Sequence, residues 1–355
     1  MTTQIDIDTA VVEEFSMRVA GERAFAANAV LVHLGDRLGL WRALASMPSS
    51  TAAELAERCG LAERYVQEWL AAQAAAGYVA YDAATASFSL PAEHALVLAD
   101  EESLACQLGS FELLVAQFAA VDQLAHAYTT GEGVGWHQHD SRLFGGVERF
   151  YGTIYRGSLL SEWVPAVEGL AERLQRGARV LDVGCGLGTA TIMLAEAFPA
   201  STFVGVDYHD ESIWRATAAA QQAGVADRVQ FEVGDASSYD DSYDVIFFFD
   251  SLHDLGDPVG ALAHARASLA PGGSVVAVEP FAEDTLEANL ENPIALAFYT
   301  GSATLCVPHS VADGGAAFGA QAGAARLTGA FVDAGFRVAQ VAARTAYNLV
   351  LEASR

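Results

Sequence analysis

The sequence predicts an α/β fold in which an open, mostly parallel sheet follows a smaller and mainly helical module. An apolar strand at residues 180–183 breaks directly into a glycine turn at residues 184–188, which opens a helical pattern. A second apolar strand ends in the carboxylate of Asp207, and a third, at residues 229–233, comes shortly before Asp235. Strands that alternate with helical patterns are typical of βαβ units, which build parallel sheets.

The glycine turn is suited to holding a ligand. Glycines carry no Cβ and tolerate positive φ, so the backbone around Gly184, Gly186 and Gly188 can approach a bound molecule closely. The carboxylate of Asp207, at the end of the next strand, is placed to accept both hydroxyls of a ribose. Together these signals predict a nucleoside-binding site at the carboxyl ends of the strands.

The spacing of the glycines separates two kinds of nucleoside site. Dinucleotide enzymes typically carry Gly-x-Gly-x-x-Gly and bind a pyrophosphate at the helix N-terminus. This chain has Gly-x-Gly-x-Gly preceded by Asp182, whose carboxylate would repel a pyrophosphate but suits an ammonium group. The residues resemble the first motif of the class I S-adenosylmethionine (SAM)-dependent methyltransferases. NAD stays open as the alternative cofactor.

The resemblance covers about residues 178–355 and implies a Rossmann-like sheet of seven strands, mostly parallel with an antiparallel last strand. It implies SAM as the cofactor and S-adenosylhomocysteine (SAH) as the product. Asp182 is expected near the ammonium group of SAM, Asp207 on its ribose and Tyr208 over one face of its adenine. The other implied contacts are of Gly184, Gly186 and Gly188 with the methionine part, of Asp235 and Ala236 with the adenine, and of Phe249 and Asp250 with the other side of the site.

The candidate catalytic residues follow the fourth and fifth strands. His253 comes just after the strand at residues 243–249, at the edge where open α/β sheets bind ligands, and Glu279 ends the strand at residues 273–279. In the O-methyltransferases that this sequence resembles, a histidine here is the general base and a strand-end acid orients it. A histidine held by a carboxylate is well matched to deprotonating a phenol. The alternative is that His253 only lines the cofactor site.

One departure from the O-methyltransferase pattern leaves the acceptor atom open. The family usually has a further acid shortly before its last long helix, whereas residues 319–325 of this chain offer only Gln321 as a polar side chain. An altered base would fit N- or C-methylation, because removal of the acceptor's proton then depends less on a side chain of the protein.

The N-terminal third predicts a winged helix. A helical stretch at residues 10–45 is followed by a capping-box start at residues 50–54, a helix at residues 61–75, and two short strands at residues 77–81 and 87–90. The same layout occurs in two-domain small-molecule O-methyltransferases, where this module forms a homodimer, and in bacterial homologues often labelled as regulators. The resemblance therefore implies a homodimer.

Charge argues against nucleic acid as a partner. The formal net charge is −26, and nothing in the chain supplies the basic surface that displaces counterions from phosphates. The expected second helix of the module carries Glu63 and Glu68 where phosphates would have to lie. Acidic membranes are excluded as partners on the same ground.

Three segments are predicted: a winged-helix dimerisation domain at residues 1–100, a helical bridge and pocket wall at residues 101–176, and a SAM-binding domain at residues 177–355. No apolar run is long enough for a membrane span, and the N-terminus lacks the pattern of a signal peptide. Four scattered cysteines give neither a disulfide framework nor a zinc motif. The chain is expected to be cytoplasmic.

Four further residues are weaker candidates for contacts with the substrate: Trp136, Tyr155, Tyr299 and His309. Two histidines beside Trp136, His137 and His139, lack the accompanying ligands of a metal site, so no metal is expected.

The sequence thus predicts a SAM-dependent methyltransferase that acts on a hydroxyl of a small molecule, with His253 as the base. The alternatives are an N- or C-methyltransferase without this base, a SAM-binding regulator or sensor without turnover, and a SAM-binding enzyme that transfers no methyl group.

Overall fold

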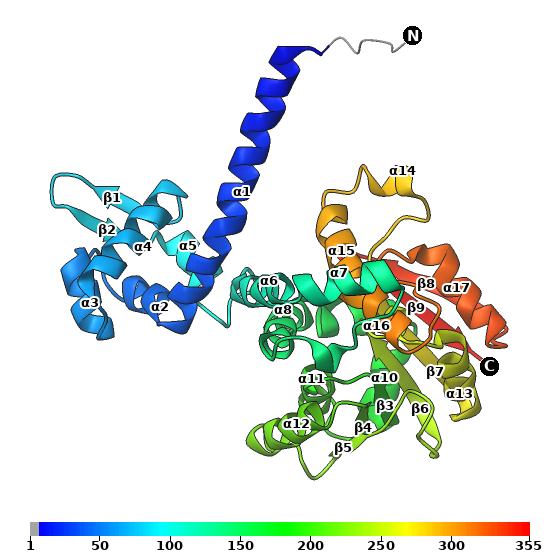
Figure 1. Ribbon diagram of the computed structural model, residues 1–355. Helices are drawn as coiled ribbons and strands as arrows, with labels where there is room; N and C mark the ends of the chain where they lie inside the picture. The colour runs from blue at the N-terminus through cyan, green and yellow to red at the C-terminus, as the bar shows by residue number, and fades with distance from the viewer. Residues whose placement is uncertain (1–6) are drawn as a thin grey trace, which may run out of the picture. The chain divides into compact units, whose positions relative to one another are not determined.

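A computed structural model describes residues 7–355 of the chain (Figure 1). Two compact units are present within it. One unit comprises the residues up to 115 together with residues 145–153, and the other comprises residues 116–144 and 154–355. The division into three functional segments stays a prediction.

The first unit contains the predicted winged helix. Its helices are α1 (Thr9–Arg37), α2 (Leu40–Ala45), α3 (Ala52–Cys59), α4 (Glu63–Ala75) and α5 (Ala92–Leu98), and its antiparallel wing strands are β1 (Ala80–Asp82) and β2 (Ser87–Ser89). The expected capping box is present, since the Thr51 hydroxyl accepts from the Glu54 N–H and the Glu54 carboxylate accepts from the Thr51 N–H at 2.8 Å.

The helical stretch expected over residues 10–45 forms two helices. Gly39 has a φ of 71°, in the left-handed region, and this divides α1 from α2. The break turns Trp41 inward, where its ring lies 4.6 Å from that of Trp69, centroid to centroid, in the core of the unit.

Helix α1 is buried only near its C-terminal end. Residues 7–27 are all exposed, although several of their side chains are large and apolar. Val11, Phe15 and Val19 recur every four residues, so they share one face of the helix. Figure 1 draws this half of α1 as an extended rod.

Arg149 links two helices and a turn of the first unit. It pairs with Asp36 at 2.7 Å, with Glu112 at 2.7 Å and with Glu101. All three acids pair with the same guanidinium group, which is itself mostly buried. This ion-pair network therefore stabilises the packing of the segments that carry these residues.

Further helices connect the module to the sheet along the chain. They are α6 (Leu108–Ala119), α7 (Val121–Thr130), η1 (Trp136–Gln138), α8 (Arg142–Ser158), η2 (Leu159–Trp163), α9 (Val164–Ala166) and α10 (Leu170–Arg176).

The second unit contains the predicted seven-stranded sheet, in the order β5-β4-β3-β6-β7-β9-β8. Its strands are β3 (Arg179–Val183), β4 (Thr202–Asp207), β5 (Val229–Val233), β6 (Tyr243–Phe249), β7 (Leu269–Pro280), β8 (Val338–Arg344) and β9 (Asn348–Ser354). The first five pair in parallel, and β9 runs antiparallel to both of its neighbours. The predicted fold class is confirmed.

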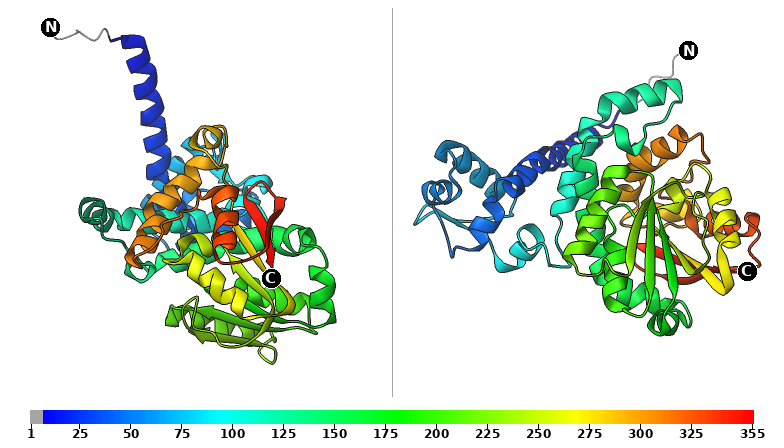
Figure 2. Two further views of the ribbon diagram at one scale, coloured as in Figure 1. Left: turned by 90° about the vertical axis from the view of Figure 1, so that its right-hand side faces the viewer. Right: turned by 90° about the horizontal axis from the view of Figure 1, so that it is seen from below.

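Helices cover both faces of this sheet (Figure 2). Helices α13 (Pro258–Ala267) and α17 (Gly323–Asp333) pack on one face, and α10, α11 (Thr189–Ala197) and α12 (Asp210–Gln222) pack on the other. The chain leaves β3 towards β4 and β5, and leaves β6 towards β7, so the order reverses between β3 and β6. Open α/β sheets bind ligands at such a reversal, beyond the carboxyl ends of the strands.

The remaining helices follow β6 and β7: η3 (Leu252–Asp254), α14 (Leu286–Asn289), α15 (Ala295–Gly301), η4 (Ser302–Cys306) and α16 (Val307–Ala312). Within the described residues, every helix is too short or too polar to cross a membrane.

Candidate functional site

The glycine turn after β3 requires its glycines. Gly184, Gly186 and Gly188 have φ of 75°, 52° and 80°. A Cβ on Gly188 would lie 2.4 Å from the Phe231 ring, and one on Gly184 would lie 2.7 Å from Cβ of Ser251. A Cβ on Gly186 would meet nothing within 4 Å in the described structure, so this side of the turn faces open space. The turn combines backbone conformations that glycine adopts readily with room for a ligand.

Asp182 lies buried directly below the turn. Its Oδ2 accepts a hydrogen bond of 2.5 Å from the Thr191 hydroxyl, whereas Oδ1 has no hydrogen-bond partner among the described residues. Burial raises the pKa of Asp182 to about 7, and the neighbouring Asp207 carboxylate adds to the rise. A buried carboxylate with one unused oxygen is suited to receiving a cationic group.

Asp207 is the last residue of β4, and its carboxylate stabilises the glycine turn. Its Oδ2 accepts from the Gly186 N–H at 3.0 Å, and its Oδ1 accepts from the His209 N–H at 2.9 Å. Burial raises its pKa although both of these N–H groups lower it. Each oxygen keeps acceptor capacity for a second donor such as a hydroxyl.

The predicted adenine contacts lie in less enclosed positions. Asp235 is exposed beyond β5, and its Oδ1 accepts from both the N–H and the hydroxyl of Ser237 at 2.8 Å. Ala236, next to it, is partly buried against the core. Tyr208 is 43% exposed, and its ring stacks on that of His309 with 5.8 Å between centroids.

The two residues that end β6 have different environments. Phe249 is buried in the core, where its ring lies 6.0 Å from that of Tyr155 and 6.2 Å from that of Trp163, between centroids. Asp250 has a φ of 49°, which is unusual for a residue other than glycine, and its N–H donates to the Val278 carbonyl at 2.7 Å. Strained backbone conformations of this kind are common at ligand-binding sites, where the packing of the surrounding structure maintains them.

His253 and Glu279 form a buried pair where β6 and β7 end side by side. Nδ1 of His253 lies 2.5 Å from Oε2 of Glu279, and the two side chains are 3% and 0% exposed. Glu279 also accepts from the N–H groups of Leu252 and His253, at 3.0 and 3.3 Å. The carboxylate therefore fixes both the ring and the backbone that carries it, and it directs Nε2 away from β7.

A second carboxylate and a thiol lie on the Nε2 side of His253. Oδ1 of Asp254 is 3.1 Å from Nε2, and Cys306, at the end of η4, has its Sγ beside both residues. All three residues are buried. Neither Asp254 nor Cys306 was among the site residues expected from the sequence. Asp254 follows His253 directly, but nothing in the sequence signals that a cysteine 53 positions later would lie beside them.

The carboxylates determine the protonation of this cluster. Burial lowers the pKa of His253, but Asp254 and Glu279 raise it by more, to well above its ordinary value. Burial raises the pKa of Asp254, but His253 lowers it by more, leaving it below its ordinary value. Each side chain therefore favours the charged form of the other, the imidazolium of His253 and the carboxylate of Asp254.

The segment before α17 lies beside His253. The Gly319 N–H donates to the His253 carbonyl at 3.3 Å. Gln321 has one amide hydrogen bond, to the Ala320 carbonyl at 3.0 Å, and its buried Oε1 has no hydrogen-bond partner in the described part of the chain. No carboxylate enters from residues 319–325, so Glu279 and Asp254 are the acids in contact with His253.

An aromatic cluster lies next to the end of β4. Trp136 contacts His309 at 6.2 Å and His139 at 6.5 Å, measured between ring centroids. Phe144 stacks on His209 at 4.3 Å and nearly parallel. The structure thus brings the predicted residues Trp136, Tyr208 and His309 together. It adds three residues that the sequence analysis did not assign to the site: His139, Phe144 and His209.

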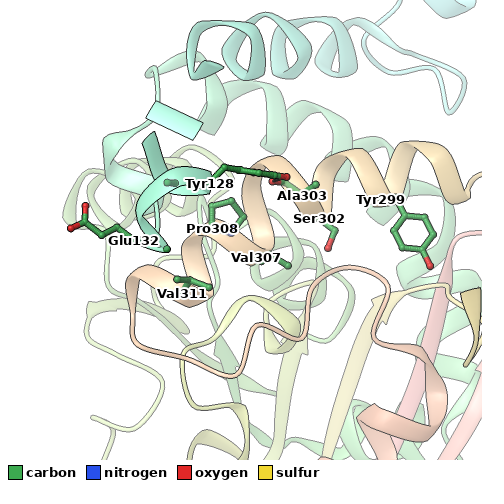
Figure 3. A pocket seen from close by; sticks show the side chains of 10 residues that line it. Tyr128, Glu132, Tyr299, Ser302, Ala303, Val307, Pro308 and Val311 are labelled. Carbon is green, nitrogen blue, oxygen red and sulfur yellow. Dashed lines mark hydrogen bonds between the residues drawn. The ribbon is translucent and has the colours of Figure 1, made fainter. Parts of the chain in front are cut away.

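The other two substrate candidates lie apart from this cluster. Tyr155 packs, partly buried, against Phe249 and Trp163, and burial together with nearby carboxylates raises its pKa well above the usual value. Tyr299 instead lines an apolar groove of about 340 Å³ between α7 and the α15–α16 segment (Figure 3). Its neighbours in the groove include Tyr128 and Pro308. Tyr299 is therefore assigned to the groove.

Two family matches cover separate parts of the chain. Residues 174–307 match a methyltransferase domain, and residues 26–100 match an Rv2258c-like winged HTH domain. The first match contains the glycine turn, Asp207, His253 and Glu279. The second contains α2 to α5 and the wing.

Curated relatives align with part of the chain. The 27-O-demethylrifamycin SV methyltransferase of Amycolatopsis mediterranei is 37% identical over 103 residues, which are 28% of this chain and 38% of that protein. The methyltransferase GfsG of Streptomyces halstedii is 31% identical over 149 residues, which are 41% of this chain and 51% of that protein. The chain thus spans at most about half the length of these relatives.

Solved structures resemble the chain over nearly its whole length. An O-methyltransferase family protein from Burkholderia thailandensis covers 98% of each chain, with a TM-score of 0.72 and 17% identity. The mitomycin 7-O-methyltransferase MmcR covers 98% of this chain and all of its own, with a TM-score of 0.70 and 18% identity. Human N-acetylserotonin methyltransferase, solved with SAM, covers 99% of each chain, with a TM-score of 0.69 and 15% identity. At these identities the likeness shows a shared two-domain fold.

Proposed function

We propose that this chain, which carries a methyltransferase domain at residues 174–307, binds SAM beyond β3 and β4 and methylates a hydroxyl of a small molecule with His253 as the base. The observation that carries the proposal is the buried pair of His253 and Glu279, with Nδ1 and Oε2 2.5 Å apart. It lies at the ends of β6 and β7, across the chain reversal from the glycine turn.

The residues around the turn fit SAM in shape and charge. The open side of Gly186 leaves room for the methionine part, and the unused Oδ1 of Asp182 fits its ammonium group, directly or through water. Asp207 would accept from the ribose hydroxyls, and the partly exposed ring of Tyr208 would cover the adenine. Asp235 and the Ala236 N–H would bind the adenine edge, and Phe249 and Asp250 would support the site from β6.

The proposed mechanism gives the protein two tasks. SAM, when bound, supplies a methyl group on a sulfonium that needs little electrophilic help, so the protein must align the acceptor and remove its proton. Nε2 of His253 would take the hydroxyl proton as the new O–CH₃ bond forms. Glu279 and Asp254 favour the imidazolium that results. Since Asp254 Oδ1 lies 3.1 Å from Nε2, the acceptor oxygen must displace this carboxylate to reach the base.

The aromatic cluster supports a planar or apolar acceptor. Trp136 and His309 offer ring faces near the end of β4, and Tyr155 lies beneath Phe249. Transfer of label from methyl-tritiated SAM to a panel of phenols and other hydroxylated small molecules tests the proposal. SAH binding without transfer to any acceptor would favour the sensor alternative.

N- or C-methylation is the second candidate, and Gln321 favours it. This residue stands where the related O-methyltransferases carry an acid, and its Oε1 is buried without a hydrogen-bond partner among the described residues. The label panel should therefore include amines and activated carbon acids. Transfer to these acceptors alone, and unaffected by removal of the His253 side chain, would establish the second candidate.

Cofactor affinity should depend on pH through Asp182. Its pKa of about 7 means that it loses its proton as the pH rises through 7, and only the carboxylate attracts the ligand's ammonium group. We expect SAH to bind roughly tenfold more tightly at pH 7.5 than at pH 6, measured by titration calorimetry. Asp182→Asn should weaken binding at pH 7.5 and remove most of this dependence. If Asp182→Asn kept the full pH dependence of SAH binding, that dependence would come from another titrating group.

We also propose that α1 forms the interface of a homodimer. Most of the stability of a helix in a protein comes from packing of its apolar face, and the exposed face of α1 formed by Val11, Phe15 and Val19 needs an apolar partner. A second copy of the chain provides such a face.

Phe15→Glu should weaken this dimer at least tenfold, because burial of one phenylalanine contributes about 1.5–3 kcal/mol. Sedimentation velocity over a range of concentrations would measure the change. Met17→Glu places the same charge on the opposite side of α1 and serves as the matched control. A monomeric wild-type protein, or equal effects of the two variants, would contradict the proposal.

The winged helix is proposed as an assembly module that does not bind DNA. On α4, Glu63 is exposed and Arg64 is paired with Glu68 at 2.5 Å, so this helix presents little free positive charge. Retardation of DNA by the protein at physiological salt would contradict this assignment.

A further inference from the structure

His253, Asp254 and Cys306 bring three different ligand types together. One ligand atom from each residue, Nε2, a carboxylate oxygen and Sγ, lies within 4.8 Å of the other two, and all three residues are buried. Among the described residues this is the one such group of three or more potential ligands. It joins η3, at the end of β6, to η4, about fifty residues later in the chain.

The histidine is already oriented as a metal ligand would be. Glu279 accepts the proton of Nδ1 at 2.5 Å, which leaves Nε2 as the atom that faces Asp254 and Cys306. Histidines that bind metals usually donate their other ring N–H to a carboxylate in this way. Glu279 is fully buried and also held by two backbone N–H groups, so the orientation of the ring is fixed before any ion arrives.

The carboxylate of Asp254 gives a second, independent indication of a metal site. Asp254 is 8% exposed, and its Oδ1 is buried without a hydrogen-bond partner in the described structure, although it lies 3.1 Å from Nε2. The two atoms therefore lie side by side without the alignment of a hydrogen bond. Neighbouring ligands on a tetrahedral ion lie about 3.3–3.7 Å apart, as follows from metal–ligand bonds of about 2.0–2.3 Å. The pair already has close to this spacing.

We propose that Nε2 of His253, a carboxylate oxygen of Asp254 and the thiolate of Cys306 bind a divalent cation of the Zn²⁺ type. A nitrogen, an oxygen and a sulfur ligand suit a borderline ion, and three protein ligands leave the fourth position to water. Binding displaces the proton from the Cys306 thiol and the proton carried by Nε2, and both pass to solvent. Since the three ligand atoms already lie within 4.8 Å of one another, small movements of these side chains bring them to the spacing of a tetrahedral site.

The proposed function gives this site a consequence. An ion on Nε2 occupies the atom that would take the acceptor's proton, so the cation acts as a reversible inhibitor of methyl transfer. This consequence rests on the proposed function, whereas the binding of the ion does not.

Titration with Co²⁺, a coloured substitute for Zn²⁺, tests the binding directly. The wild-type protein, reduced and free of metal, is expected to bind one Co²⁺ per chain and to show the near-ultraviolet band of a cobalt–thiolate bond. Cys306→Ser should abolish this band, and Asp254→Asn should weaken binding at least tenfold. Cys59→Ser, which removes a cysteine of the first unit, is the matched control and should leave the band unchanged. Circular dichroism would establish that each variant is folded.

The outcomes separate the two proposals. No thiolate band in the wild type, or a band that persists in Cys306→Ser, would overturn the metal site. A band together with inhibition by Zn²⁺ that a chelator reverses would support both proposals. A band without inhibition would support the metal site and contradict the role of His253 as the base.

Discussion

His253→Ala is expected to lower kcat by about 10²–10⁴-fold, the usual contribution of a positioned general base. The ring is 3% exposed and held by Glu279, so no other side chain can take its place without rearrangement of the site. SAH affinity should change little, because His253 is not among the proposed cofactor contacts. Initial rates with an acceptor identified from the label panel would measure the loss. His126→Ala, an exposed histidine of α7, is the control.

The pH profile distinguishes a base from a residue that only lines the site. The raised pKa of His253 means that its neutral form, which can accept a proton, becomes more abundant as the pH rises above neutrality. Turnover by the wild type should therefore increase with pH in this range, and the alanine variant should lose the increase. Glu279→Gln should give an intermediate loss, because the amide keeps a hydrogen bond but no charge. A loss below tenfold in His253→Ala at saturating substrate would exclude the base role.

Asp207→Ala is expected to weaken SAM and SAH binding at least tenfold, equivalent to about 1.4 kcal/mol or more. Two effects combine in this variant. The ribose hydroxyls lose their acceptor, and the glycine turn loses the carboxylate that accepts from the Gly186 N–H at 3.0 Å. Titration calorimetry with both ligands would measure the change.

Asp210→Ala is the matched control for this measurement. Asp210 is an exposed acid three residues further along, at the start of α12, and its loss should leave the affinity unchanged. Equal affinities of the wild type and Asp207→Ala would contradict the proposed cofactor site. Tight binding by the wild type alone would locate the ribose at the end of β4.

The sequence by itself determined the elements of the sheet and the positions of the strand-end residues. Apolar runs, the glycine turn and the acids after the strands are local signals, because they depend on backbone conformation and on the order of elements along the chain. The capping box at Thr51 is of the same kind. The carboxyl ends of parallel strands meet at one edge, so Asp182, Asp207, His253 and Glu279 were predicted to converge before any contact was known.

The tertiary structure alone decided what surrounds these residues. Cys306 reaches His253 from a helix after the fifth parallel strand, and Tyr299, seven residues earlier, lines an outer groove instead. No local pattern separates these two positions, because the path of the chain after β7 depends on packing between distant segments. The direction in which the pKa of His253 shifts was decided in the same way. It depends on how Asp254 and Glu279 approach a buried ring, and that is a property of distances and burial rather than of sequence order.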